Sequence, residues 1–224
     1  AIAKVEAEEI LIYSEEQRGA IAHLLDKQQI QILTGKVGTG KTTLLKPVVE
    51  AYKEAGYISV GVAFQGKVSD LLSTELGIAS FTLDQLRHHW KEREALIKKL
   101  PELQGKALER AELQIEKKSQ YLLTDKHVVI LDEGNMVEGN LWKLLLDNVE
   151  SSGAHLRIVQ DQNQIKALYG LDISRLVEQE VGAYEVKEVF RQKTPWMREC
   201  SALLNDHKIE AGLTPYAEKG HFTF

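Results

Sequence analysis

Short apolar runs alternate with amphipathic stretches along most of this 224-residue chain. Apolar runs of four to eight residues are typical of buried strands, whereas apolar residues three and four apart are typical of helices. The pattern predicts strands at 29–33, 58–64, 128–131, 155–159 and 184–189. It predicts helices at 14–27, after 42 and up to 55, at 67–75 and at 141–150. Strands separated by helices indicate an α/β fold with a parallel sheet covered on both faces.

Two local signals refine the helices. Ser14-Glu15-Glu16-Gln17 has the spacing of a capping box that opens the first predicted helix. We expect Pro47 near the start of the second, where a proline costs least.

Residues 83–125 interrupt the alternation. Their apolar residues fall mostly at helical spacing and Pro101 divides them, which predicts two helices in an antiparallel hairpin. From Arg87 to Lys126, ten Lys and Arg against seven Asp and Glu give a net charge of +3, so the rest of the chain carries −8. We therefore expect one domain over 1–224 with a helical insertion at 83–125.

Composition narrows the class of protein. Hydrophobic residues make up 43% and charged residues 27%, which excludes a disordered, collagen-like or disulfide-rich chain. Cys200 is the single cysteine, which favours a reducing, cytoplasmic location. The longest apolar run, at 57–64, is far shorter than the ~20 residues of a membrane span. The chain begins without Met, and we expect it to be a piece of a longer protein.

A glycine-rich segment carries the strongest chemical signal. Residues 35–42 match the pattern G-x-x-x-x-G-K-[ST] between a predicted strand and a predicted helix. Glycines let backbone N–H groups surround a phosphate, and the helix N-terminus favours the same negative charge. Lys41 is expected at the β- and γ-phosphates and Thr42 at Mg²⁺. The expected ATP contacts are Gly35, Val37, Gly38, Thr39, Gly40, Lys41, Thr42 and Thr43.

Three further segments follow predicted strands and supply the remaining catalytic candidates. Asp132 and Glu133 end an apolar strand, where Asp132 would bind Mg²⁺ and Glu133 would orient or deprotonate the attacking water. Gln164 would sense the γ-phosphate, and Arg191 would reach it with a forked guanidinium. Polar turns and a solvated arginine are the structural alternatives for the last two.

Taken in order, these motifs resemble those of superfamily 1 DNA helicases of the RecD-like branch. The segments 77–83 and 216–220 are especially similar to the helicase part of conjugative, TraA-like relaxase–helicases. The resemblance covers roughly residues 14–224 without the charged helical stretch. It implies a P-loop NTPase (RecA-like) fold and an ATP-hydrolysing motor domain that acts on single-stranded DNA. The quoted motif residues are Gln17, Gly35–Thr42, Ala63–Lys67, Ser80–Leu83, Asp132-Glu133, Asp161 to Gln164, and Arg191-Gln192.

The resemblance also assigns roles outside the phosphate loop. Gln17 would contact adenine, and both this role and the capping box can hold. Gln65, Gly66, Lys67 and Thr82 would contact single-stranded DNA, with an ordinary helix start as the alternative for the first three. The hairpin at 83–125 is either a solvated structural element or a guide for DNA.

The chain also departs from the family pattern. Gln160 stands where the family usually has Gly, and Gly134-Asn135 stand where it usually has Ala-Gly or Ala-Ser, which bears on catalytic efficiency. The second motor domain and the relaxase domain have no counterpart in the sequence, so we expect weak ATPase activity and no unwinding from this chain alone. A nucleotide-binding remnant without turnover and a P-loop kinase are the alternatives.

Overall fold

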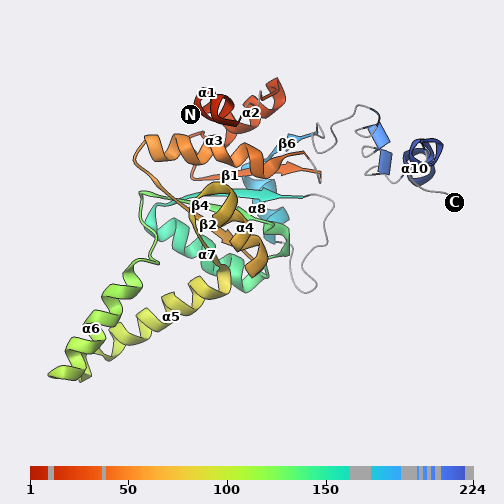
Figure 1. The fold of residues 1–224 in the computed structure, drawn as a ribbon. Coiled ribbons are helices and arrows are strands. Elements are labelled where there is room, and N and C mark those ends of the chain that lie inside the picture. The colour runs from red at the N-terminus through yellow and green to blue at the C-terminus, as the bar shows by residue number, and fades with distance from the viewer. Residues whose placement is uncertain are drawn as a thin grey trace.

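A six-stranded parallel sheet forms the centre of the computed structural model (Figure 1). The structure describes residues 1–9, 13–36, 39–161, 173–187, 196, 199–200, 203–204 and 208–219, with the backbone alone for 7–9. The strand order is β3-β2-β4-β5-β1-β6, and every neighbouring pair is parallel. The predicted α/β fold with a P-loop NTPase type of sheet is therefore confirmed.

The strands lie close to where the apolar runs predict them. Their bounds are β1 Ile30–Gly35, β2 Ile58–Ala63, β3 Ala79–Thr82, β4 His127–Asp132, β5 His155–Gln160 and β6 Tyr184–Val186. Strand β3 has no counterpart among the predictions. It has four residues, none of them fully buried, so it lacks the apolar run that marks the central strands.

The helices cover both faces of this sheet. Their bounds are α1 Ile2–Glu9, α2 Glu15–Leu24, α3 Lys41–Glu54, α4 Gly66–Leu76, α5 Leu83–Lys99, α6 Lys106–Ser119, α7 Gly139–Ser152, α8 Ile173–Val181 and α10 Ile209–Glu218. Short 3-10 turns occupy Leu100–Glu102 (η1) and Gly134–Met136 (η2). Helices α1, α8 and α10 are not among the predicted elements. Within the described residues, no helix combines the length and the apolar character that crossing a membrane requires.

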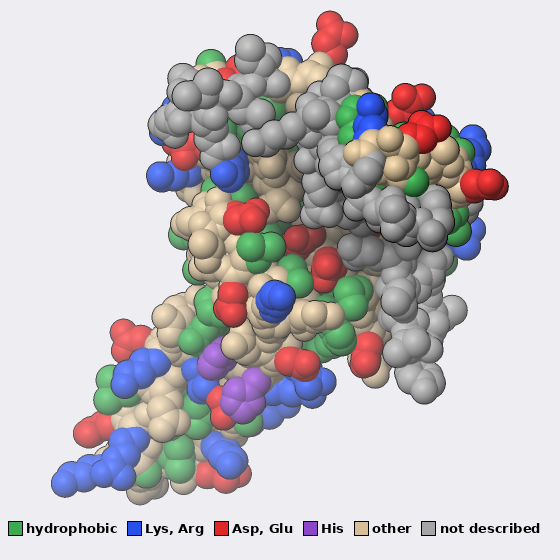
Figure 2. All heavy atoms as spheres, turned by 45° about the vertical axis from the view of Figure 1, so that its right-hand side comes forward, with side chains coloured by type: hydrophobic (Ala, Val, Ile, Leu, Met, Phe, Trp, Pro, Cys, Tyr) green, Lys and Arg blue, Asp and Glu red, His purple; other side chains and the backbone are tan. Residues whose placement is uncertain are grey.

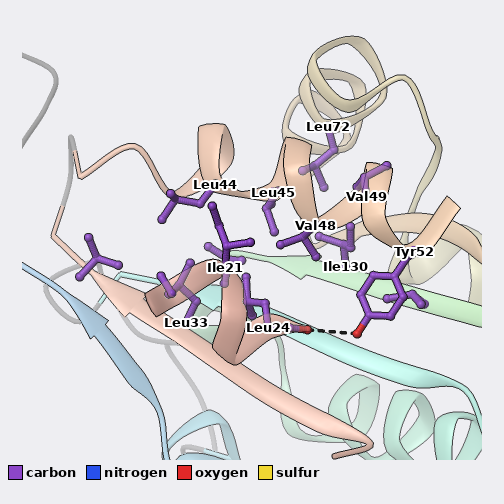
Figure 3. Packing of buried hydrophobic residues seen from close by; sticks show 14 of the residues in the cluster. Ile21, Leu24, Leu33, Leu44, Leu45, Val48, Val49, Tyr52, Leu72 and Ile130 are labelled. Atoms are coloured by element: carbon purple, nitrogen blue, oxygen red, sulfur yellow. Dashed lines mark hydrogen bonds between the residues drawn. The ribbon is translucent and has the colours of Figure 1, made fainter. Parts of the chain in front are cut away.

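Two apolar cores separate the layers. On one face, Ile21 and Leu24 of α2 and Leu45 and Val48 of α3 pack above Ile130 of β4 (Figure 3). On the other face, residues of α5 and α7, including Trp90 and Trp142, pack against β2, β4 and β5. Strands buried on both faces explain why their sequences are continuously apolar.

Helices α5 and α6 form an arm that projects from the body (Figure 1). The two helices predicted over 83–125 are present, with Pro101 inside the η1 turn between them. At the base of the arm, the Trp90 indole N–H donates to the Tyr121 carbonyl at 2.8 Å. This bond connects α5 to the segment that follows α6. The helical content of this stretch is as predicted, and its status as an insertion stays a prediction.

Pro47 is not near the start of its helix as the sequence suggests; it is the seventh residue of α3. A proline there cannot donate to the carbonyl four residues earlier, which belongs to Thr43. The buried Tyr13 hydroxyl donates to that carbonyl at 3.2 Å. A side chain from outside the helix therefore replaces the missing backbone bond, one residue after Thr42.

The guanidinium of Arg157 is completely buried beneath the sheet edge opposite the phosphate loop. It donates to the carbonyls of Leu24 at 2.6 Å, Asp26 at 3.0 Å and Gln29 at 3.0 Å, and to the Tyr52 hydroxyl at 2.6 Å. The carbonyl of Leu24 belongs to the C-terminal end of α2, where a cation is favoured. Arg157 thereby joins β5, α2 and α3, and its contacts with the Leu24 carbonyl and the Tyr52 hydroxyl are buried.

We expect Arg157→Leu to lower the free energy of unfolding by about 3 kcal/mol, because the buried Leu24 carbonyl and Tyr52 hydroxyl and two part-buried carbonyls lose their donor. Urea denaturation measures the loss. Arg110→Leu, at an exposed position of α6, is the matched control and should change stability by less than about 0.5 kcal/mol. Equal stability of the two variants would contradict the role given to Arg157.

Candidate nucleotide-binding site

The parallel register brings the candidate residues to one edge of the sheet. Asp132 at the end of β4 pairs with Ala63 of β2 and Val159 of β5. Gly35 at the end of β1 pairs with Val186 of β6. Because all strands point the same way, the loops that follow them meet at this carboxyl edge, which is where ligands bind in open α/β sheets.

The described part of the phosphate loop depends on glycine at two positions. Gly40 has φ 76°, a left-handed conformation that only glycine adopts without strain. A Cβ at Gly35 would lie 2.8 Å from Thr39 Oγ1 and 2.9 Å from the Val186 carbonyl oxygen. Thr39 in turn donates to the Lys36 carbonyl at 3.0 Å. Packing therefore excludes a side chain at Gly35, and the left-handed backbone disfavours one at Gly40. Val37 and Gly38 lie outside the described residues.

Lys41, the first residue of α3, folds its side chain back over the loop. Its ammonium donates to the carbonyl of Lys36 at 3.1 Å and also to that of Gly35. Asp161 Oδ2 lies 3.6 Å from the same nitrogen, and the Asp161 side chain is buried. The cation is thus held at the mouth of the loop, where a phosphate is expected.

Asp132 lies near this cation, and Glu133 directly follows it at the end of β4. The pKa of Asp132 is raised to about 6, mainly because burial disfavours the charged carboxylate. The Glu133 N–H and the Lys41 charge lower this pKa, and the Glu133 charge raises it. Asp132 Oδ1 accepts the Glu133 N–H at 2.9 Å. Burial also raises the pKa of Glu133. Both carboxyl groups are therefore desolvated, as expected for groups that bind a cation or accept a proton.

Glu133 has an unusual backbone. Its φ of 56° and ψ of 41° place it in the left-handed region, and it is the only described residue besides glycine with a positive φ. This conformation costs a non-glycine residue roughly 1–2 kcal/mol. The turn into η2 thus holds the Glu133 side chain at the sheet edge at a cost in stability, which is typical of functional positions.

The oxygen atoms of Thr42, Thr43 and Asp132 are too few to hold a magnesium ion unless phosphate oxygens and water complete its coordination. Thr42 and Thr43 lie half-buried in the first turn of α3, and Asp132 lies at the end of β4. Among the residues that the structure describes, no three His, Cys, Asp or Glu side chains cluster to hold a metal ion. Mg²⁺ commonly binds through one or two protein oxygens plus substrate phosphates and water, so these residues suit it in that mode.

Gln17 reaches the phosphate loop from α2. Its backbone and side chain complete the capping box with Ser14, as predicted, and its Oε1 accepts the Ser14 N–H at 3.0 Å. Its Nε2 lies 3.9 Å from where a Cβ on Gly40 would stand. The helix cap therefore engages the side-chain oxygen of Gln17, and the side-chain NH₂ group lies toward the phosphate loop. Its contact with adenine stays a prediction.

The two departures from the family pattern have structural reasons. Gln160 is buried, donates from Nε2 to Glu178 at 2.9 Å and accepts from the Ser174 hydroxyl, so it attaches α8 to the sheet. A Cβ at Gly134 would lie 3.0 Å from Ile158 and 3.3 Å from Trp142, which leaves little room for alanine. Asn135 follows with both amide atoms buried and no hydrogen-bond partner in the described chain.

The predicted DNA-contacting residues follow strands at the same edge. Gln65, Gly66 and Lys67 are exposed where β2 gives way to α4. Thr82 ends β3, and its hydroxyl accepts the Gln85 N–H at 3.2 Å as the N-cap of α5. Its cap role is clear from this contact, and its DNA contact stays a prediction.

Two predicted catalytic residues lie outside the described part of the chain, and two residues near the phosphate loop have no role in the sequence-based predictions. Gln164 and Arg191 lie outside the described residues. Asp161 lies near Lys41 but has no predicted role of its own, although its position directly after an apolar strand was a usable signal. Tyr13 supports the helix turn that carries Thr42 and Thr43, and the sequence offered no local pattern for it.

The sheet and the strand-to-helix loop that begins at Gly35 have the fold of the P-loop nucleoside triphosphatases. The chain belongs to the AAA domain family, whose model matches residues 12–224.

Curated relatives are conjugal transfer proteins. The chain is 30% identical over 203 residues to the conjugal transfer protein TraA of Rhizobium radiobacter, which covers 91% of this chain and 16% of the relative. It is 31% identical over 192 residues to a probable conjugal transfer protein TraA of Sinorhizobium fredii, covering 86% of this chain and 15% of the relative. The predicted relationship to TraA-like proteins is confirmed, and the chain spans about a sixth of their length.

Solved Pif1 helicases share the fold. The Pif1 helicase from Candida albicans has a TM-score of 0.57 at 22% identity, covering 88% of this chain and 44% of that one. A structure of two coordinating Pif1 helicases on forked double-stranded DNA has a TM-score of 0.56 at 17% identity, covering 93% of this chain and 52% of that one. At these identities the likeness concerns the fold.

We expect Asp132→Asn to stabilise the ligand-free protein above pH 6. The folded pKa of about 6 exceeds the ordinary value of 3.8, so the folded state resists losing this proton. Wild-type stability should therefore fall as pH rises from about 4 to 6, by roughly 2 kcal/mol, and the variant should lack this fall. Urea denaturation of both proteins between pH 4 and 8, without nucleotide or metal, checks it. Parallel pH profiles would contradict the burial of Asp132.

Proposed function

We propose that this chain binds and hydrolyses ATP as the motor domain of a DNA helicase. The observation that carries the proposal is the convergence of Lys41, Asp132 and Glu133 on the glycine loop at one sheet edge. A lysine there neutralises the β- and γ-phosphates, and the helix N-terminus of α3 adds its dipole. Both act on the charge that develops during phosphoryl transfer.

The remaining roles follow the same geometry. Thr42 and Asp132 would hold a magnesium ion, which when bound neutralises phosphate charge and orients the γ-phosphate. Glu133, with its raised pKa, accepts or orients the proton of the attacking water. Gln17 presents its amide NH₂ beside the loop for the adenine ring. Gln164 and Arg191 are proposed as γ-phosphate contacts from their motif positions.

The cellular role proposed is DNA processing during conjugative transfer. The relatives with this range of identity are conjugal transfer proteins, and the fold neighbours are helicases. Gln65, Gly66, Lys67 and Thr82 would contact single-stranded DNA along the same edge that holds ATP. Translocation and unwinding are proposed for the full-length protein in the cytoplasm, and only weak ATPase activity for these 224 residues.

Lys41→Ala should weaken ATP binding on the order of tenfold or more, because a charge-assisted contact worth roughly 1.5–3 kcal/mol is lost. Titration with a fluorescent ATP analogue in the presence of Mg²⁺ measures this. Lys53→Ala, near the other end of α3 and exposed, is the matched control and should bind as wild type. Equal affinity of all three proteins would remove the phosphate-binding role of Lys41.

Glu133→Gln should lower ATP turnover by at least tenfold while ATP affinity stays within about twofold, because the amide keeps the size of the side chain but cannot accept the proton. Phosphate release and analogue binding are measured on the same preparation. Glu138→Gln makes the same chemical change at an exposed position five residues later and should leave turnover intact. If both variants turn over at the wild-type rate, Glu133 is not the base.

A further inference from the structure

The arm contains a cavity well away from the phosphate loop. Its volume is about 500 Å³, within the range of ligand-binding pockets. The lining comes from one stripe of α5 and from the facing part of α6 with the residues that follow it. The lining residues on which the proposal rests are His89, Glu92, Lys99, Lys117, Lys118 and Tyr121.

One side of the cavity is a stacked aromatic pair. The rings of His89 and Tyr121 lie 3.7 Å apart with an interplanar angle of 4°. Phe81 of β3 meets the Tyr121 ring edge-on at 5.3 Å, and the Tyr121 carbonyl accepts the Trp90 indole N–H. The pair is thus anchored to the body of the protein and is preorganised to stack against another flat ring.

The charged side chains of the cavity leave an excess of positive charge. Glu92 is paired with Lys118 and lies 3.2 Å from His88 Nε2. Lys99 and Lys117 are exposed and make no salt bridge within the described part of the chain. His89 Nδ1 is buried and has no hydrogen-bond partner there. Figure 2 shows histidine side chains on the arm next to lysine and arginine side chains.

A flat aromatic surface beside two uncommitted cations is complementary to a nucleotide unit. Bases stack on aromatic side chains, and lysines bind phosphate. The neighbouring amides of Gln114 and Gln120 supply donors and acceptors of the kind that base edges carry. A protein partner would need a larger apolar area than this small cavity offers.

We propose that the arm cavity binds a nucleotide unit, with the base against the His89–Tyr121 pair and a phosphate against Lys99 and Lys117. The unit belongs either to a single strand or to a free nucleotide. This site is separate from the ATP site, and its existence does not depend on ATP hydrolysis.

The test measures binding of a labelled twelve-residue thymidine oligonucleotide by fluorescence anisotropy over a series of salt concentrations. All proteins carry Lys41→Ala, which takes the phosphate loop out of the comparison. Lys99→Ala/Lys117→Ala is compared with Lys91→Ala/Lys106→Ala, which removes the same charge from exposed positions of the same two helices outside the cavity. Circular dichroism verifies that both remain folded.

The cavity variant should lose affinity on the order of tenfold and reduce the slope of log K against log salt by about 0.7, as the loss of one neutralised phosphate on a single strand requires. The control variant should lose clearly less. A 5-iododeoxyuridine oligonucleotide should crosslink to the 89–121 stretch, and His89→Leu should diminish that crosslink. Displacement of the oligonucleotide by millimolar thymidine monophosphate identifies a free nucleotide as sufficient, and its failure identifies a strand.

Equal losses in the two double variants, crosslinks only outside the arm, or absence of binding to either probe would overturn the proposal. None of these results bears on ATP binding at Lys41, which the wild-type titration tests separately.

Discussion

The parallel pairing of β1, β4 and β5 is the constraint on which the candidate site depends. Because these strands run the same way in fixed register, the loop after Gly35, the carboxylate of Asp132 and the carboxylate of Asp161 reach one edge together. A slip of one residue would turn every side chain of a strand to the other face and move its last residue out of the site. The apolar burial of both faces therefore specifies the chemistry as well as the fold.

Polar groups on the two sides of this sheet illustrate opposite uses of burial. Arg157 is buried with its donors matched by carbonyl and hydroxyl oxygens, so it joins three elements. At the carboxyl edge, Asp132 is half-buried with a raised pKa, and Glu133 occupies a left-handed backbone conformation. Both features lower stability, which natural proteins tolerate where function requires it. The candidate site therefore lies at the edge of the sheet that carries the backbone strain, whereas the polar group at the opposite edge has its hydrogen-bond partners.

Features that depend on a few neighbouring residues could be predicted from the sequence, whereas features that depend on distant contacts could not. The phosphate loop, the capping box at Ser14 and the apolar strands are encoded within a few residues, and the structure contains them. Strand β3 was not predicted because none of its four residues is fully buried and because its position depends on pairing with β2. Pro47 is accommodated within α3 because Tyr13 donates to the Thr43 carbonyl, and no local pattern predicts a contact between residues thirty positions apart. Gln160 departs from the family pattern and attaches α8 to the sheet, and its effect on catalytic efficiency stays a prediction.

The missed strand also links the arm to the nucleotide edge. Ala63 of β2 pairs with Asp132 on one side and with Thr82 of β3 on the other, and Thr82 caps α5 where the arm begins. Phe81, one residue earlier, contacts Tyr121 at the base of the arm. A displacement of β3 relative to β2 would therefore move the start of α5 and the aromatic wall of its cavity together. Rigid elements that share a short strand in this way are the physical connection through which one site can bias another.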